Sequence, residues 1–386
     1  MRLTGSGSRS IALCLLAPLV VGGGSALLGV CGPFTDVAPD VFCPFVLEIF
    51  TLGITTGTTP STYDPSANVS RLQMAAFLSR TVDRVLTRGG RRAALNQFWT
   101  IQGSINLALT TVGASSQFVQ SDGADLWVGE YGAGTVARIR GSDGRRLETW
   151  TTPAGMALLP ATGKVFVAGF ANPGTLYRID PSQPAGAATV VASTLGANPR
   201  SIAFDGSRIW TANVFNSISI VTPGAAIPWT VTTVTTGFNG PAGALYDGSN
   251  IWITHGGTAR LTKLDSDGAI LQTVTVGLGP TYAVFDGSNI WVANQSANSV
   301  SVVRASNGTV LTTLTGNGIS APIAAAFDGE RVLITNLADS VSLYKAADLS
   351  VIGNFPTGVS TGPVGACSDG VNFWIVLSFS NKLARF

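Results

Sequence analysis

Charged side chains are scarce in this chain of 386 residues. Lys, Arg, Asp and Glu make up 11% of it, against about 25% in an ordinary soluble protein, and the formal net charge is +2. This balance excludes a broad basic surface, so no nucleic acid partner is expected. Solubility must rest on Ser, Thr, Asn and Gly instead. With 46 Gly and 19 Pro, the composition favours short strands and turns over long helices.

The usual residues of catalysis are also few. The chain has one histidine, His255, and it contains no HExxH, P-loop or CxxC motif. Asp265 and Asp267 match part of a calcium loop, but the Glu that such a loop requires downstream is missing. The sequence therefore indicates no catalytic constellation, no metal site and no cofactor.

The first 30 residues have the pattern of an export signal. Arg2 and Arg9 make the start of the chain basic. An apolar run then extends from Ile11 to Val21, and small residues follow at 22–26. This run is shorter than the about 20 apolar residues of a membrane-spanning helix. We expect a signal peptide over 1–30, with an uncleaved signal anchor as the alternative, and no other membrane contact.

Two of the four cysteines, Cys31 and Cys43, lie twelve residues apart just after this segment. An exported chain enters an oxidising compartment, where a disulfide is stable and strengthens a small segment. We therefore expect a disulfide between Cys31 and Cys43. Cys367 occupies a position that other repeats fill with apolar residues, which favours a buried thiol.

Residues 31–88 differ in pattern from the rest of the chain. Pro44 to Leu52 is an apolar stretch of helical character. Ser70 to Leu86 has apolar residues at helical spacing, among them Leu78, and Ser70 is placed as an N-cap. A turn-rich connection lies between them, so the segment predicts a small helical module.

Four blocks of this module resemble the S-layer homology (SLH) family. They are Phe34-Thr35-Asp36-Val37, Leu52-Gly53-Ile54-Thr55-Thr56-Gly57, Tyr63-Asp64-Pro65 and Val69 to Leu78. The resemblance implies attachment to cell-envelope polysaccharide, with glycan contacts at Asp36, Arg71 and Gln73. Gln73 departs from the family's usual Glu, and one copy is present where three usually assemble. The alternative is a module that docks on the rest of the chain or on a partner.

Residues 89–103 follow this module as a linker. Arg84, Arg88, Arg91 and Arg92 cluster around its start. No aromatic residues are interleaved with these arginines, as they would be in a nucleic-acid site. A solvated connector is therefore the preferred interpretation.

From about residue 105 the chain repeats itself. Phe204 to Asn213 and Phe285 to Asn294 correspond almost residue for residue, each around an Asp-Gly pair. Further copies contain Asp122, Asp247, Asp328 and Asp369, and an eroded one contains Thr162-Gly163, which makes seven. The spacing is close to 41 residues. A copy holds four strand-like runs, for example Thr281–Phe285, Ile290–Ala293, Ser299–Val303 and Val310–Leu314. This period is typical of β-propeller blades.

Two further marks recur in the copies. The Asp-Gly pair supplies a hairpin turn, because Gly accepts the positive φ that such turns need. A large aromatic follows the Asp by five residues in most copies, and we expect it to be buried between neighbouring sheets. A proline precedes the Asp by six residues in five copies, and is predicted to lie before the first strand.

The ends of the repeat predict closure of a ring. The last copy stops at Phe386 after its third strand, and Ile105 to Val112 supplies a candidate for the missing fourth strand. The fold class expected is mainly β: a seven-bladed β-propeller of four-stranded blades over 104–386, with 104–113 as the closing strand and a small N-terminal α-helical module. Ile290 to Val303 is similar to YVTN-type and NHL-type propeller repeats.

His255 is the residue that could indicate an enzyme. Virginiamycin B lyase is a propeller with a catalytic histidine and a metal, so a metal-assisted lyase of that type, or a lactonase-like hydrolase, is the alternative function. However, sibling copies place Asn213, Asn294 and Asn336 at the position of His255. We therefore interpret His255 as a strand-end residue that bonds local backbone.

The residues after the second strand of each copy differ, as an asymmetric binding surface requires, although drift produces the same variation. Candidate contacts at this propeller mouth are Tyr131, Phe170, Phe215, His255 and Gln295. The expected ligand is an unknown protein or carbohydrate. The leading hypothesis is a secreted, non-catalytic binding protein of the cell surface or envelope, whose propeller is displayed by the SLH-like module.

Overall fold

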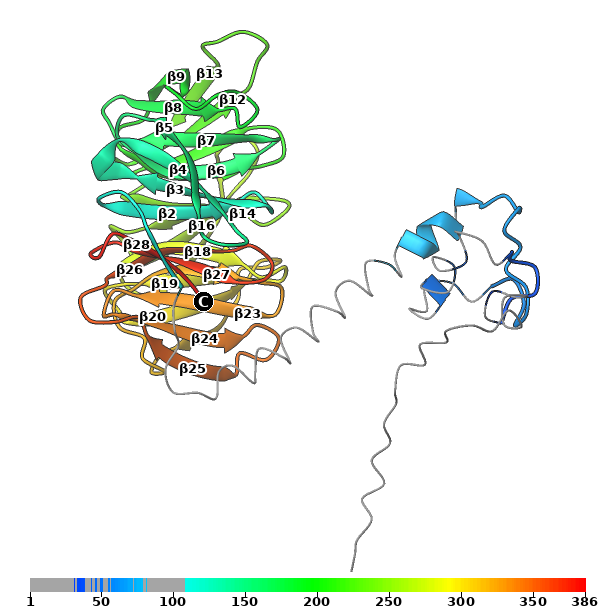
Figure 1. Cartoon of the computed structure of the whole chain (residues 1–386). Coiled ribbons are helices and arrows are strands. Elements are labelled where there is room, and N and C mark those ends of the chain that lie inside the picture. Colours follow the sequence, from blue (N-terminus) through cyan, green and yellow to red (C-terminus); the bar gives the residue numbers. More distant parts are fainter. Residues whose placement is uncertain are drawn as a thin grey trace, which may run out of the picture. The chain divides into compact units, whose positions relative to one another are not determined.

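The protein is described from a computed structural model that covers residues 108–386 and, with gaps, residues 31–81. The expected signal segment 1–30 and linker 89–103 lie outside the described residues. The chain divides into two compact units, Met1–Leu95 and Asn96–Phe386, which are treated separately (Figure 1). Among the described residues, no helix has the length and apolar character needed to span a membrane.

Twenty-eight strands of the second unit form seven antiparallel four-stranded sheets, as the sequence predicted (Figure 1). Blades 1 to 3 contain β2 (Ser116–Ser121), β3 (Asp125–Glu130), β4 (Thr135–Arg140) and β5 (Arg146–Thr151); β6 (Gly155–Ala161), β7 (Lys164–Gly169), β8 (Gly174–Ile179) and β9 (Thr189–Leu195); and β10 (Pro199–Phe204), β11 (Ile209–Asn213), β12 (Ser217–Thr222) and β13 (Thr230–Val234). Blades 4 and 5 contain β14 (Pro241–Tyr246), β15 (Ile251–His255), β16 (Arg260–Leu264) and β17 (Ile270–Thr275); and β18 (Pro280–Phe285), β19 (Asn289–Asn294), β20 (Ser299–Arg304) and β21 (Val310–Leu314).

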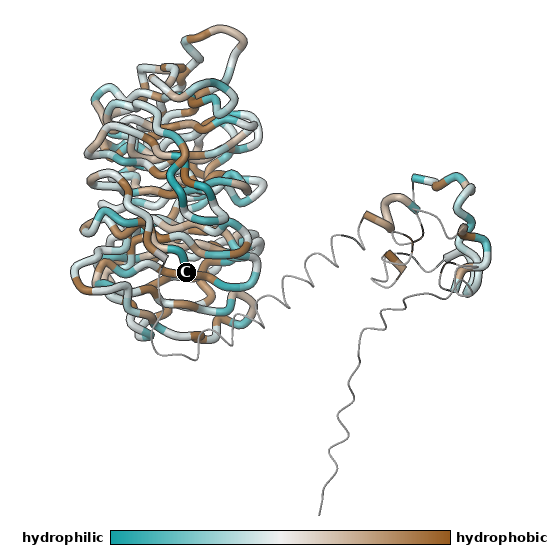
Figure 2. The backbone as a smooth tube through the Cα atoms, in the orientation of Figure 1, coloured by the Kyte–Doolittle hydropathy of each residue, from teal (hydrophilic) through white to brown (hydrophobic). Residues whose placement is uncertain are grey.

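The last two blades complete the series. They contain β22 (Pro322–Phe327), β23 (Arg331–Asn336), β24 (Ser340–Lys345) and β25 (Val351–Pro356); and β26 (Pro363–Ser368), β27 (Phe373–Leu377), β28 (Lys382–Arg385) and β1 (Ala108–Thr111). A short 3-10 helix, η1 (Tyr131–Ala133), follows β3. Apolar residues recur along the strands of every blade (Figure 2). Their side chains fill separate clusters between neighbouring sheets, which is how each blade buries its faces.

An aspartate and a tryptophan hold the first hairpin of a blade in five of the seven blades. In five blades the Asp Oδ2 accepts a hydrogen bond from the indole Nε1 five residues later, over distances of 2.8, 2.7, 2.7, 2.7 and 2.6 Å; the pairs are Asp122–Trp127, Asp205–Trp210, Asp247–Trp252, Asp286–Trp291 and Asp369–Trp374. The same carboxylate accepts backbone N–H groups two and three residues on. These indoles are fully buried, so the carboxylate satisfies a donor that has no access to water.

The recurring prolines correct one sequence expectation. Pro199, Pro241, Pro280, Pro322 and Pro363 are the first residues of their strands, and do not precede them. First strands pair on one side only, because their other edge faces the axis of the ring. A missing N–H is tolerated on such an edge, which explains why proline is accepted inside the strand.

The ring is closed by strands from both ends of the propeller. β1 pairs with β28 in antiparallel register, from Ala108 opposite Arg385 to Thr111 opposite Lys382. The seventh sheet therefore has the order β1-β28-β27-β26, and β26 lies beside β2 of the first blade. This arrangement leaves no gap between the first and last blades.

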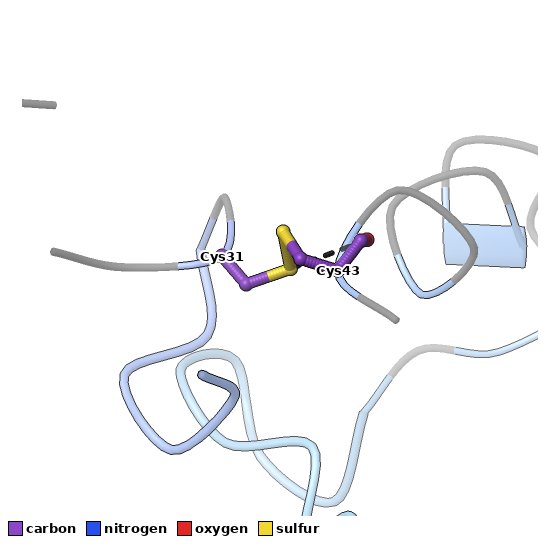
Figure 3. The surroundings of a disulfide bond; sticks show 2 residues. All are labelled: Cys31 and Cys43. Atoms are coloured by element: carbon purple, nitrogen blue, oxygen red, sulfur yellow. Dashed lines mark hydrogen bonds between the residues drawn. A yellow bond between two sulfur atoms is a disulfide. The ribbon is translucent and has the colours of Figure 1, made fainter. Parts of the chain in front are cut away.

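The N-terminal unit has a small core of its own. Cys31 and Cys43 form a disulfide with a Cα–Cα separation of 5.6 Å (Figure 3). Phe34 is buried beside this bridge, and its ring meets those of Phe50 at 5.0 Å and Tyr63 at 5.4 Å. A disulfide stabilises such a segment because so few apolar residues are available to it.

Candidate binding surfaces

Two faces of the propeller differ in composition. The loops between second and third strands, together with the connections between blades, form one face, called here the loop face. The hairpin turns between first and second strands and the loops between third and fourth strands form the opposite turn face. All of the predicted mouth residues belong to the loop face or to the strand ends that reach it.

The predicted aromatic residues are accessible on the loop face. Tyr131 is 37% exposed, and its ring meets the partly buried ring of Phe170 edge-on with centroids 6.1 Å apart. Phe215 is 64% exposed. Gln295 is half-buried, and its backbone N–H donates to the carbonyl of Gly279. The structure therefore brings Tyr131 and Phe170 together and places Phe215 and Gln295 in other blades.

His255 is not accessible in this way. It is 1% exposed at the end of β15, where Nδ1 accepts the backbone N–H of Asn239 at 3.2 Å and Nε2 lies 2.9 Å from Thr262 Oγ1. The ring is stacked on Phe238. Burial lowers the pKa of His255 to about 4, and the nearby Arg260 acts in the same direction. Both ring nitrogens are thus engaged in a neutral imidazole, which does not support a ligand contact.

Sibling residues explain this placement. Asn213 donates to Ser217 and Ser219, and Asn294 and Asn336 make the same pair of hydrogen bonds within their own blades. Glu130 of blade 1 occupies the same position and accepts the N–H of Gly113 at 2.6 Å. The position is a buried polar clamp between strand ends and the preceding connection, as the interpretation of His255 as a strand-end residue implied.

A second set of clamps joins neighbouring blades. Asn216, Asn298 and Asp339 have positive φ in the loops between second and third strands. Their side-chain oxygens accept backbone N–H groups of the next connection, at 2.8 Å for Gly240 and 2.7 Å for Ala321. Asp339 accepts three such groups, from residues 360–362, and these bonds, Gly362 first, lower its pKa. The loop face is consequently fixed by hydrogen bonds between blades.

The first strands surround a central cavity of about 460 Å³. Its walls carry Ala, Leu, Val, Phe and Ser side chains and no charged residue. Phe118, Arg200 and Tyr282 from alternate blades meet across the loop-face end, where Arg200 Nε donates to Tyr282 Oη at 3.0 Å and the Phe118 ring packs edge-on against Tyr282. Burial raises the pKa of Tyr282, so its hydroxyl stays protonated at neutral pH.

The residues present do not fit the metal that a lyase-type propeller would hold. Among the described residues, no group of three or more His, Cys, Asp or Glu side chains is arranged to bind a metal ion. The recurring aspartates are occupied by indole and backbone donors, and His255 is buried. No step of a mechanism can therefore be assigned to a metal in this part of the chain.

In the N-terminal unit, two of the three predicted glycan contacts have structural roles. Asp36 accepts the backbone N–H groups of Tyr63 and Asp64 at 2.7–3.1 Å, and these bonds, led by Tyr63, lower its pKa. Gln73 Oε1 accepts the N–H of Ser70 while Ser70 Oγ accepts that of Gln73, which is a capping box with Ser70 as N-cap. Arg71 is exposed at the start of the same helix.

Three exposed apolar residues of the loop face were missed from the sequence. They are Leu278, Val359 and Phe379. Phe379 is 64% exposed, and its ring lies directly against Gly362, where a Cβ would be only 2.5 Å from the ring. The sequence could have indicated Phe379, because it corresponds to Phe215 of blade 3. Both lie one residue beyond the loop position that was compared between the copies.

Comparison with known proteins identifies a domain in the N-terminal unit. Residues 33–75 match the family model of the S-layer homology domain. Such a domain indicates association with the cell surface or S-layer, and these domains typically bind cell-envelope polysaccharide. No curated protein matches the chain.

Solved structures with the same fold are propellers. A streptogramin B lyase is 15% identical, over 74% of this chain and 98% of its own, with a TM-score of 0.61. A virginiamycin B lyase from Staphylococcus aureus is 17% identical, over 72% and 98%, with a TM-score of 0.62. A catalytically inactive His-to-Ala variant of that enzyme, with quinupristin, is 17% identical over 72% of this chain and 99% of its own, with a TM-score of 0.61. At this identity the likeness shows the fold alone. The chain is thus a seven-bladed β-propeller that carries an S-layer homology domain.

Proposed function

We propose that the chain is an exported, non-catalytic binding protein, held at the cell envelope by its S-layer homology domain and presenting the loop face of its propeller to a ligand. The observation that supports this most strongly is the combination of the SLH match with a loop face that exposes Tyr131 and Phe215. The Cys31–Cys43 disulfide supports export, because such bonds persist in oxidising compartments.

Anchoring is assigned to the helix that begins at the capping box. Arg71 is exposed and takes no part in the capping box, which Ser70 and Gln73 form. Its guanidinium donors suit an anionic or hydroxyl-rich glycan. Asp36 and Gln73 contribute by holding the loop and the helix start in place. Their substitution would therefore weaken binding through loss of structure, which makes Arg71 the sharper probe.

The test is cosedimentation of the full chain with purified envelope polysaccharide. The wild type should sediment, Arg71→Ala should lose most of this binding, and both proteins should unfold at the same temperature. Gln73→Glu is the matched variant, because Glu restores the family residue and preserves the capping box. It should bind at least as tightly as the wild type. Equal sedimentation of Arg71→Ala and wild type would remove the anchoring role.

A lyase is the second candidate function, because the solved structures of similar fold include streptogramin B and virginiamycin B lyases. The buried, doubly hydrogen-bonded His255 argues against it. Incubation of the full chain with quinupristin and divalent metal tests this directly. We expect no turnover. A reaction that the wild type catalyses and His255→Ala does not would make the lyase the correct function.

A further inference from the structure

The exposed aromatic residues of the propeller lie on one arc. Among the described residues, the large aromatic side chains with high exposure are Tyr131, Phe215 and Phe379, and all three lie in loops between second and third strands. Phe170 lies in the corresponding loop of blade 2 and touches Tyr131. Blades 7, 1, 2 and 3 are consecutive around the ring. Four neighbouring blades therefore each present one aromatic ring, here called the aromatic arc.

The remaining blades do not continue this pattern. The corresponding loops of blades 4 and 5 begin with Gly256 and Gln295, and that of blade 6 with Leu337. The arc thus covers about half of the rim. A ligand that used all four rings would have to be extended, because a small compact molecule contacts only one or two blades.

The face around the arc is almost without charge. The seven loops between second and third strands and the seven connections between blades contain a single charged residue, Asp339, and backbone amides occupy its carboxylate. Two basic residues, Arg260 and Lys382, begin third strands beside this face, and Lys382 Nζ donates to Thr111. The turn face, in contrast, carries a ring of aspartates. The four loops that carry the arc therefore contain no charged residue.

This composition selects the kind of ligand. An acidic polymer would lose hydration on the loop face without gaining an ion pair in its loops. The apolar C–H faces of a pyranose fit aromatic rings, while Ser, Thr and Asn side chains and loop backbone bond its hydroxyls. A protein interface, in contrast, is built around one contiguous apolar core with a polar rim. Aromatic rings spread over four blades, on a face with almost no charge, favour a sugar chain.

The arc is also rigid. The Phe379 ring is seated on Gly362, and the N–H of Phe379 donates to the carbonyl of Thr361 at 3.0 Å. The clamp of Asn216 onto Gly240 fixes the loop that carries Phe215. Side chains that are already ordered lose little conformational entropy on binding, so exposed rings held in this way are suited to recognition.

From these observations we infer that the aromatic arc of Tyr131, Phe170, Phe215 and Phe379 binds an extended, neutral polysaccharide. The inference rests on the proposed function and adds the chemical class of the ligand. It separates two glycan sites in the chain: the SLH domain takes the envelope polymer, and the propeller takes an uncharged sugar chain. The propeller would then connect the cell to a neutral glycan outside it.

Biolayer interferometry of the full chain on immobilised dextran, laminarin, galactomannan and polygalacturonate tests this. We expect saturable binding to at least one of the three neutral glycans and none to polygalacturonate. Tyr131→Ala, Phe215→Ala and Phe379→Ala should each weaken that binding by about three- to tenfold. Phe379→Trp should retain it. Because no ion pairs are involved, a rise from about 0.05 to 0.5 M NaCl should change the affinity by less than about twofold.

Two control variants locate the binding. Leu271→Ala removes an exposed apolar side chain of the outer strand β17 and should bind like the wild type. Arg71→Ala should also leave neutral-glycan binding unchanged. Binding that is lost in Arg71→Ala and retained in the arc variants would belong to the SLH domain and overturn the proposal. So would a lack of binding to all three neutral glycans, or binding to polygalacturonate alone.

Failure of this inference is distinguishable from failure of the proposed function. If the arc variants lose a protein partner on intact cells while no neutral glycan binds, the loop face is still a binding face and the sugar assignment is wrong. If Arg71→Ala remains on the envelope like the wild type, the anchoring role is wrong, whatever the arc binds.

Discussion

At the scale of single residues, the aspartate of the first hairpin turn combines two functions in five blades. Asp286 Oδ1 accepts the N–H groups of Ser288 and Asn289, which fixes the turn, and Oδ2 accepts the indole N–H of Trp291. The spacing of five residues between Asp and Trp therefore allows the indole to pack between the sheets and to donate a hydrogen bond to the Asp carboxylate. The sequence predicted the turn and the buried ring, but not the bond between them, because no pattern states where a buried indole finds its acceptor.

Substitution of this aspartate measures the bond. Asp286→Ala leaves a buried indole donor and two backbone donors without their acceptor, so the free energy of unfolding should fall by about 2–3 kcal/mol. Urea unfolding followed by fluorescence provides the measurement. Asp267→Ala, in an exposed loop, is the control and should change stability by less than about 0.5 kcal/mol. Equal effects of the two substitutions would contradict a structural role for the Asp–Trp pair.

The same carboxylates determine acid stability. Burial raises the pKa of Asp205, but hydrogen bonds from Trp210 and the backbone of Arg208 outweigh it and bring the pKa down to about 2. An unfolded aspartate has a pKa of about 3.9. The stabilisation is therefore complete above about pH 4 and is lost as the pH falls towards about 2. Unfolding by urea across this range should show the decline, and Asp205→Asn should make it shallower. An unchanged slope would contradict the assignment.

His255 acts in a higher pH range and in the same direction, because its pKa is also lowered in the folded chain. Its pKa is about 4 in the folded chain and about 6.5 when unfolded, so between these values the unfolded state binds a proton that the folded state does not. Stability should therefore fall as the pH drops from about 6.5 to about 4. His255→Asn, which copies the sibling blades, should remove this dependence and remain folded. A pH dependence that persists in the variant would mean that another group is responsible.

At the scale of elements, the joint between β1 and β28 closes the ring. Leu109 and Thr110 lie opposite Ala384 and Leu383, and antiparallel pairing alternates between bonded and unbonded residues. Replacing both by proline must therefore remove one ladder hydrogen bond. We expect a loss of about 1–3 kcal/mol, measured by urea unfolding. The matched control, Leu109→Ala with Thr110→Ala, keeps the bonds and should lose much less. Equal losses would show that the joint does not depend on backbone pairing.

Much of the architecture at this scale followed from the sequence, because local signals repeat seven times. The four strands around Asp286 were expected at Thr281–Phe285, Ile290–Ala293, Ser299–Val303 and Val310–Leu314. The observed β18 to β21 differ from these bounds by one residue at half of the strand ends and agree with them at the others. The clamps could not be predicted. Asn216 reaches Gly240 of the next connection, and such a contact depends on a positive φ and on the angle between blades.

The candidate site was predictable only in part, for a similar reason. Aromatic residues after the second strand identified Tyr131, Phe170 and Phe215, but exposure depends on neighbours that periodicity does not place. Phe379 was therefore missed and His255 was included. In the N-terminal unit, helical spacing placed Leu78 on a buried face, yet it is 60% exposed, because the described core forms around the disulfide and Phe34.

At the scale of the whole molecule, two units with different chemistry are joined in one chain. The small unit carries the SLH domain and a disulfide, and the large one presents a loop face with little charge and a charged turn face. Neither of the described parts offers a metal cluster or an accessible histidine. This division fits the proposed function, in which one unit attaches the protein and the other recognises a ligand.

Labelling of intact cells tests the central claim most directly. Cells that produce the full chain are treated with an antibody against the propeller, without permeabilisation. We expect strong surface labelling for the wild type, and for Arg71→Ala we expect weak cell labelling with the protein recovered from the medium. Propeller that becomes accessible to the antibody only after lysis would contradict display at the surface. Arg71→Ala that stays on the cells like the wild type would contradict anchoring through the SLH domain.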